Sequence, residues 1–174
     1  MLLLTWPLTQ RRSTVFDLTI RPAIDADLTA LVRSFGQVGF FSDRLRRQRQ
    51  GRGMLLIALR GAIPVGNVYV WWEPAEEPEL RERLPGVPLL THLEVHPHHR
   101  NRGIGTALIR EAEDVLRRRG HRRVALGVDV RNVDAQRLYT RLDYTEWPYP
   151  PVRVPEETFQ IFVKSLVDMP IKHA

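Results

Sequence analysis

The stretch HPHHRNRGIG, residues 96–105, contains three of the six histidines of the chain, together with two arginines and two glycines. This composition is compatible with two kinds of site. Histidines that lie close to a carboxylate, here Glu94, could ligate a metal ion. Arginines and glycines in front of a helix could instead bind phosphate. The segments on either side therefore decide what the stretch does and which fold contains it.

The flanking segments predict a strand followed by a helix. LLTHLEV, residues 89–95, has the length and composition of a strand. IGTALIREAEDVLRRRG, residues 104–120, places its apolar residues along one stripe at helical spacing, and Gly120 ends it. The quoted stretch is therefore predicted to connect a strand to a helix.

A connection of this kind is suited to anions. The first turn of a helix has unpaired N–H groups, and the helix dipole favours negative charge there. Gly103 and Gly105 carry no side chain, so a ligand can approach the backbone closely. Arg100 and Arg102 can add charge-assisted hydrogen bonds to phosphate. These residues favour a phosphate-binding loop.

Length and composition indicate a globular protein. The 174 residues suffice for one domain, expected at residues 16–174 after a poorly ordered leader of residues 1–15. No run approaches 18 apolar residues, so no membrane span is expected. Arg11 and Arg12 follow the short N-terminal apolar patch, in the opposite order to a signal peptide, so we expect a cytoplasmic protein. The absence of cysteine excludes disulfides, zinc–thiolate sites and thiol nucleophiles.

The formal net charge of +6 leaves the partner open. A basic chain can bind nucleic acid or an anionic cofactor. The same charge also arises when arginine-rich helix faces are merely solvated. The composition alone does not separate these interpretations.

Hydrophobic periodicity predicts alternating strands and helices along the rest of the chain. Strands are expected at residues 16–20, 54–59, 65–72, 89–95, 122–130 and 158–166, and helices at residues 21–35, 42–50, 104–120 and 132–142. Ser42 and Asn132 are the expected N-caps of the second and last helices. The acidic, proline-rich segment 73–88 is expected to be a long connection with one helical turn. Early hairpins and later β-α-β crossovers imply an α/β (mixed α+β) fold, with a mixed sheet flanked by helices.

Two spaced motifs carry a resemblance to a known family. The run L-x-V-x-P-x-x-R-x-x-G-x-G, here Leu93, Val95, Pro97, Arg100, Gly103 and Gly105, is similar to the acetyl-CoA signature of the GNAT superfamily of N-acetyltransferases. The pattern N-x-x-A-x-x-L-Y-x-x-x-G-[FY] is matched by Asn132, Ala135, Leu138, Tyr139 and Tyr144. Asp143 stands where the superfamily usually has glycine, but aspartate tolerates the left-handed conformation. With IRPAIDADL, residues 20–28, as a similar opening, the resemblance covers residues 16–166.

The resemblance implies a GNAT-like central mixed, mostly antiparallel sheet with splayed strands at 89–95 and 122–130. It implies acetyl-CoA as co-substrate, with its pantetheine arm between those strands, and no metal. The backbone of Leu93 and Val95 would pair with that arm. The pyrophosphate would be held by the loop and first helical turn, namely Arg100, Asn101, Arg102, Gly103, Ile104, Gly105 and Thr106. The second motif adds Asn132, Ala135 and Tyr139 to the expected cofactor site.

Acetyl transfer to an amine requires a base, because a lysine-like amine has a pKa near 10.4 and is mostly protonated at neutral pH. Glu94 and His92 are the candidates by strand position, although Glu94 could equally be a surface carboxylate. Tyr139 matches the position of the acid that protonates the leaving thiolate. Its alternative is a packed aromatic residue of the 132–142 helix.

The sequence leaves more than one role open for the histidines. His92, Glu94 and His96 alternate and would share one strand face, where they could bind a metal ion or take part in catalysis. His98 and His99 could face anions in the phosphate loop or simply face water.

The expected acceptor is a primary amine on a small molecule or a peptide, attacked directly in a ternary complex. Segments 42–50, 73–88 and 146–157 are expected to shape its pocket, and four aromatic residues could stack on a cation, Trp71, Trp72, Trp147 and Tyr149. A homodimer is compatible with the sequence, and no membrane partner is expected. The alternatives are a non-catalytic acyl-CoA-binding module and, less favoured, a basic nucleic-acid-binding protein.

Overall fold

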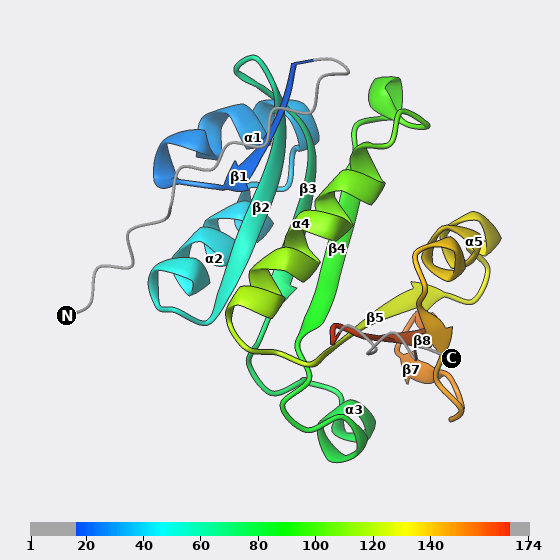
Figure 1. Ribbon diagram of the computed structural model, residues 1–174. Coiled ribbons are helices and arrows are strands. Elements are labelled where there is room, and N and C mark those ends of the chain that lie inside the picture. The colour runs from blue at the N-terminus through cyan, green and yellow to red at the C-terminus, as the bar shows by residue number, and fades with distance from the viewer. Residues whose placement is uncertain (1–16, 168–174) are drawn as a thin grey trace, which may run out of the picture.

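The computed structural model describes residues 17–167, and the expected leader over residues 1–15 lies outside this range. Figure 1 shows one sheet with helices on its faces. The strands are β1 (Leu18–Pro22), β2 (Gly53–Arg60), β3 (Ile63–Trp71), β4 (Leu89–Val95), β5 (Arg123–Asp129), β6 (Thr145–Glu146), β7 (Val152–Val154) and β8 (Glu157–Ser165). The helices are α1 (Leu28–Phe35), α2 (Val38–Arg49), α3 (Pro78–Arg83), α4 (Ile104–Arg118) and α5 (Val133–Arg141), with 3₁₀ turns at Asp25–Asp27 and Pro97–His99.

The described strands form a mixed sheet in the order β1-β2-β3-β4-β5-β8-β6, with β7 paired to β8. The pairs are antiparallel except for β4 and β5, which run parallel. These two strands pair only where Leu89 and Leu90 face Ala125 and Leu126, and beyond that point they diverge (Figure 1). The sheet confirms the mixed, mostly antiparallel arrangement with splayed strands expected from the sequence.

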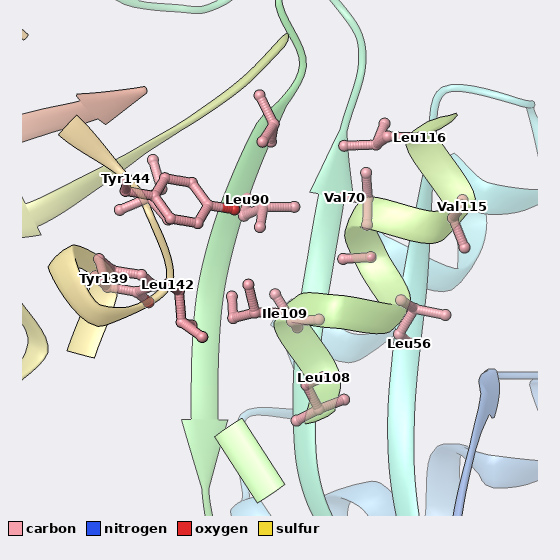
Figure 2. Packing of buried hydrophobic residues seen from close by; sticks show 14 of the residues in the cluster. Leu56, Val70, Leu90, Leu108, Ile109, Val115, Leu116, Tyr139, Leu142 and Tyr144 are labelled. Atoms are coloured by element: carbon pink, nitrogen blue, oxygen red, sulfur yellow. The ribbon is translucent and has the colours of Figure 1, made fainter. Parts of the chain in front are cut away.

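Helix α4 covers one face of the sheet. Its Leu108, Ile109 and Leu116 are fully buried and pack on β2 and β3, where Leu56 and Val70 lie beneath them (Figure 2). Their spacing is that of one helix face, so the stripe read from the sequence is the buried face of α4.

Helices α1 and α2 cover the opposite face. Leu31 of α1 and Phe41 of α2 are fully buried in a cluster with Leu55, Ile57 and Tyr69. Because β2 and β3 are covered on both faces, their sequences are nearly continuous apolar runs rather than alternating ones.

Helix α2 begins at Val38, four residues before the N-cap that the sequence suggested at Ser42. The prediction missed the first turn, which contains Phe40 and the buried Phe41. The residue that precedes the helix is Gln37, whose φ of 56° lies in the left-handed region. This is not the extended conformation of a usual N-cap, so no ordinary start signal marked the position.

Other local predictions are confirmed. Strand β4 begins and ends as expected, and the Asn132 side chain caps α5 by accepting from the Ala135 N–H at 3.0 Å. Asp143 has a φ of 66° and so takes the conformation that glycine usually supplies. One boundary differs: the strand expected at residues 16–20 extends to Pro22 as β1, because β1 is an edge strand, where proline is tolerated.

Glu113 of α4 is a buried carboxylate, only 2% exposed. It accepts from Lys164 Nζ of β8 at 2.9 and 3.0 Å and from the Tyr144 hydroxyl at 2.9 Å. Burial and then the Glu113 charge raise the pKa of Tyr144, so its hydroxyl stays protonated and donates. The cluster links α4 to the C-terminal part of the sheet, on the far side of the divergence between β4 and β5.

Lys164→Met is expected to lower the free energy of unfolding by about 2–4 kcal/mol, because it leaves Glu113 buried without its nearest cation. Arg117, whose Nη2 lies 3.5 Å from Glu113, limits the loss. Denaturant unfolding measures the effect. The double variant Glu113→Met/Lys164→Met should recover most of the stability, because an apolar pair of similar volume replaces the ions. A single variant as stable as the wild type would contradict this role.

Candidate active site

Strand β4 contains a β-bulge at its centre. Opposite β3, Asn67 faces Glu94 and Tyr69 faces Thr91, so His92 and Leu93 together oppose the single residue Val68. His92 has a φ of 54°, in the left-handed region. A bulge bends a strand and increases its twist. The parallel pairing with β5 ends at Leu90, just before the bulge, so β4 has a free edge beyond it.

The free edge belongs to Leu93 and Val95. The His96 N–H donates to the Val65 carbonyl at 2.9 Å, on the β3 side. Because the N–H and C=O groups of successive residues in a strand point to opposite edges, those of Val95 face away from β3, toward the space where β4 and β5 diverge. The Val95 carbonyl accepts from Arg100 Nε at 3.2 Å, which agrees with this direction.

The N-terminus of α4 provides free donors beside that edge. Gly103, with a φ of 76°, is the N-cap, and it contributes no side-chain hydrogen bond. The Ala107 N–H donates to the Gly103 carbonyl at 3.0 Å and forms the first bond of the helix. The N–H groups of Ile104, Gly105 and Thr106 therefore have no partner within the helix.

A pocket of about 630 Å³ joins these groups. Of the predicted cofactor residues it is lined by Leu93, Val95, Arg100, Asn101, Gly103, Ile104, Gly105, Thr106 and Ala135. The lining also includes residues that the sequence reasoning did not assign to the cofactor, His99, Asp134, Arg137, Leu138 and Arg141. A Cβ built on Gly105 would lie 3.8 Å from the side chains of Leu93 and Val95, so residue 105 faces the pocket wall.

On the face of β4 that carries α1 and α2, Glu94 is the centre of a second group. Its Oε2 accepts from Gln37 Nε2 at 3.3 Å and lies 3.2 Å from His92 Nε2. The His92 ring lies 4.0 Å from the Phe40 ring, centroid to centroid. Burial lowers the pKa of His92 against the opposing effect of Glu94, so the imidazole is neutral at neutral pH. A carboxylate only accepts, so Nε2 carries the proton that is shared with Glu94.

Gln37 and His92 are both in the left-handed region, with φ of 56° and 54°. Such a conformation costs a non-glycine residue about 1–3 kcal/mol and is concentrated at functional sites. Both strained residues direct their side chains to Glu94. Sequence reasoning identified Glu94 and His92 but missed Gln37 and Phe40, which reach the site only because α2 begins at Val38.

Residues 21–144 match the sequence profile of the acetyltransferase (GNAT) family. The chain belongs to this family. An uncharacterized N-acetyltransferase of Methanocaldococcus jannaschii is 35% identical over 102 residues, which cover 57% of this chain and 42% of that protein. The chain thus spans about two fifths of the length of this relative.

Solved structures share the GNAT fold. A proposed acetyltransferase from Salmonella typhimurium with its cofactor acetyl-CoA has a TM-score of 0.67 at 20% identity, covering 88% of this chain and 96% of that one. The ribosomal-protein-S18-alanine N-acetyltransferase of Escherichia coli has a TM-score of 0.67 at 18% identity, covering 89% and 97%. A PaiA N-acetyltransferase from Thermoplasma acidophilum in complex with coenzyme A has 0.66 at 16%, covering 85% and 98%.

Three of the residues assigned through the GNAT motifs lie apart from the pocket lining. Asn132 caps α5, Arg102 is exposed, and Tyr139 is buried in the core. The Tyr139 ring lies 5.7 Å from that of Tyr144. Figure 2 shows both side chains on the α5 side of β4. Burial raises the pKa of Tyr139 to about 12, so its hydroxyl is protonated at neutral pH.

The histidines of β4 and of the segment that follows it have three different surroundings. His92 contacts Glu94, whereas the His96 ring stacks 5.4 Å from that of His98 and lies 6.2 Å from Phe35. His99 lines the pocket. Among residues 17–167 no group of three potential metal-ligating side chains comes together. No helix in the same range has the length and apolar character needed to cross a membrane.

Proposed function

We propose that this GNAT domain is an acyl-CoA-dependent N-acetyltransferase that moves the acetyl group of acetyl-CoA to a primary amine by direct attack in a ternary complex. One observation carries the proposal. The free donors of α4 and the free edge of β4 line a single pocket, and the Glu94 group lies on the same strand. An anionic cofactor bound in this pocket would therefore lie beside the strand that also carries Glu94, the proposed base.

The pocket residues fit acetyl-CoA. Its pyrophosphate is an anion, and the N–H groups of residues 104–106 would bind it at the positive end of the α4 dipole. The arginines of the pocket, Arg100, Arg137 and Arg141, add cations. The free edge at Leu93 and Val95 would hydrogen-bond the amides of the pantetheine arm. When bound, acetyl-CoA supplies an acetyl group activated as a thioester.

Glu94 is proposed as the general base. Both of its side-chain hydrogen bonds fall on Oε2, which leaves Oε1 for the acceptor amine or for a water molecule. His92 and Gln37 hold the carboxylate in place. The side chain of Glu94 is 31% exposed, so substrate and solvent can reach it. His92 remains the alternative base through Nδ1, because its Nε2 is engaged with Glu94.

Tyr139 is proposed to protonate the leaving thiolate. Tyr139→Phe keeps the buried ring and removes the hydroxyl, so we expect kcat to fall by roughly 10–10³-fold, with acetyl-CoA affinity nearly unchanged. The lower end of this expected fall in kcat is small because water can protonate the thiolate in place of the tyrosine. Steady-state kinetics with one amine and a thermal melt measure both effects. Tyr149→Phe, at a tyrosine that is 42% exposed, is the control. A folded Tyr139→Phe variant with wild-type turnover would leave Tyr139 as a packing residue.

The acceptor site is proposed to lie beside Glu94, under α1 and α2. The aromatic residues considered from the sequence contribute little open surface there. Trp71 and Trp147 are buried, whereas Trp72 and Tyr149 have Arg119 and Arg83 over their rings at 3.9 and 4.2 Å. The S18-alanine enzyme shares the fold, so peptide N-termini belong among the acceptors to be tested, with polyamines, amino acids and aminoglycoside-like amines.

The proposal is tested by incubating the protein with acetyl-CoA and each amine of such a panel while the release of free thiol is measured. We expect at least one amine to accelerate thiol release and to appear as its acetylated product. Calorimetry with acetyl-CoA runs in parallel. Binding without turnover on any amine would favour the acyl-CoA-binding module instead. Salt-dependent affinity for nucleic acid, with no acetyl-CoA binding, would favour the nucleic-acid-binding alternative.

A further inference from the structure

Asn67 of β3 is fully buried, and its amide is unpaired. It is 0% exposed, and neither Oδ1 nor Nδ2 has a hydrogen-bond partner among residues 17–167. Most buried polar side-chain atoms in proteins have at least one partner, so two unpaired atoms on one side chain require an explanation. Leaving a buried amide unpaired costs about 1–3 kcal/mol.

The place of Asn67 in the sheet connects it to the Glu94 group. Asn67 is the direct cross-strand partner of Glu94 in the antiparallel β3–β4 pair. Side chains at such paired positions lie on the same face, with Cβ atoms about 4.5–5.5 Å apart. On the other side Asn67 is paired with Ile57, and the next residue on its own face is Tyr69, both fully buried. Glu94 is therefore the polar residue paired with Asn67 across the two strands.

Complete burial limits what can satisfy the amide. An acceptor substrate cannot reach a side chain with no exposed surface, whereas a water molecule can occupy a small polar site if it finds two to four partners. The Asn67 amide offers one donor group and one acceptor group. Glu94 Oε1, which neither His92 nor Gln37 engages, offers a further acceptor.

We propose that Asn67 is a positioning residue of the acetyl-transfer site, whose amide holds a buried water molecule against Glu94. This inference rests on the proposed function. The water takes the proton released by the acceptor amine and passes one of its own protons to the Glu94 carboxylate, so that the water is regenerated.

Two nearly isosteric variants test the role, Asn67→Val and Asn67→Thr. Both suit a strand, but only threonine keeps a group that can bind water. With an amine from the panel, we expect kcat to fall by roughly 10–10²-fold in Asn67→Val and clearly less in Asn67→Thr. Activity kept in Asn67→Thr but lost in Asn67→Val would indicate a water-binding role rather than a packing role. Acetyl-CoA affinity, measured by calorimetry, should stay the same.

Tyr69→Phe is the matched control. The Tyr69 hydroxyl is also buried and unpaired on the same face of β3, but it points at Gly53 rather than at Glu94. Its removal should leave kcat unchanged. This separates a catalytic effect from the general effect of removing an unpaired polar group.

Equal kcat in the Val variant and the wild type would overturn the inference while leaving the acetyltransferase proposal intact. An inactive wild type, in contrast, would defeat that proposal first. In that case, or if the Val variant fails to fold, a high-resolution crystal structure of the wild type decides. A water within hydrogen-bond distance of both Asn67 and Glu94 supports the inference, and an Asn67 amide without such a water overturns it.

Discussion

Gly105→Glu is expected to abolish acetyl-CoA binding, with a loss in affinity of at least about 100-fold, or about 2.7 kcal/mol. Gly105 is the second residue of α4, its N–H is one of the free donors, and a Cβ there faces Leu93 and Val95 across the pocket wall. A carboxylate at this position would occupy the place proposed for phosphate and repel it. The fold should survive, because glutamate has a higher helix propensity than glycine by about 0.5–1 kcal/mol and an acidic residue suits the first turn.

Gly39→Glu is the matched control, because Gly39 is the second residue of α2 just as Gly105 is of α4. Neither glycine has a positive φ, so both substitutions change the same local helix position without backbone strain. Gly103→Glu is a poorer test, because the φ of 76° makes any side chain strained there. Calorimetric titration and thermal melts of both variants measure the result. A folded Gly105→Glu protein with undiminished affinity would remove the phosphate-loop interpretation.

Glu94→Gln is expected to lower kcat/KM for the acceptor amine by about 10²–10⁴-fold, the range typical of a general base. The amide keeps the size of the side chain and can still contact His92 and Gln37, so the group around it should stay in place. It cannot accept a proton at neutral pH. Acetyl-CoA affinity should change little, because Glu94 does not line the pocket proposed for the cofactor. Its side chain lies instead on the face of β4 that carries α1 and α2.

Glu111→Gln serves as the control for Glu94→Gln. Glu111 is a carboxylate on α4 that pairs with Arg118 at 3.1 Å and takes no part in either group. Its loss should leave turnover unchanged. Kinetics over a pH range distinguish the outcomes. If Glu94→Gln retains the wild-type rate and pH profile, the base must be His92 or a group that the present geometry does not single out.

The cofactor side of the site could be predicted largely from the sequence, because it depends on local features. Strand 89–95, Gly103 and the helix that follows are close along the chain, and free N–H groups at a helix start follow from helix geometry itself. Asn132 caps α5 by a bond to a residue three positions away, which is also a local signal. Arg137 and Arg141 were missed, because their approach to the phosphate loop depends on how α5 packs beside the divergence of β4 and β5.

The acceptor side was decided by tertiary structure. The alternation of side chains along a strand placed His92 and Glu94 of segment 89–95 on one face. No residue in that segment predicted the β-bulge opposite Val68. Gln37 is 57 residues from Glu94 in the chain, and its side chain reaches the carboxylate only when α2 starts at Val38 and packs on the sheet. Asn67 was the one polar residue in the apolar run VGNVYVW, yet its pairing with Glu94 follows from the register of β3 and β4.

The sequence by itself determined the family, the order of strands and helices, and the glycine-containing loop that we propose binds phosphate, because periodicity, caps and glycines act over a few residues. Only the tertiary structure decided which side chains surround Glu94, which pocket residues join Arg100, and why Tyr139 is buried. These depend on strand register, on a bulge and on the packing of helices on a sheet. Such features are fixed by contacts between segments that lie far apart in the sequence, and each contact leaves only a weak signal in either segment alone.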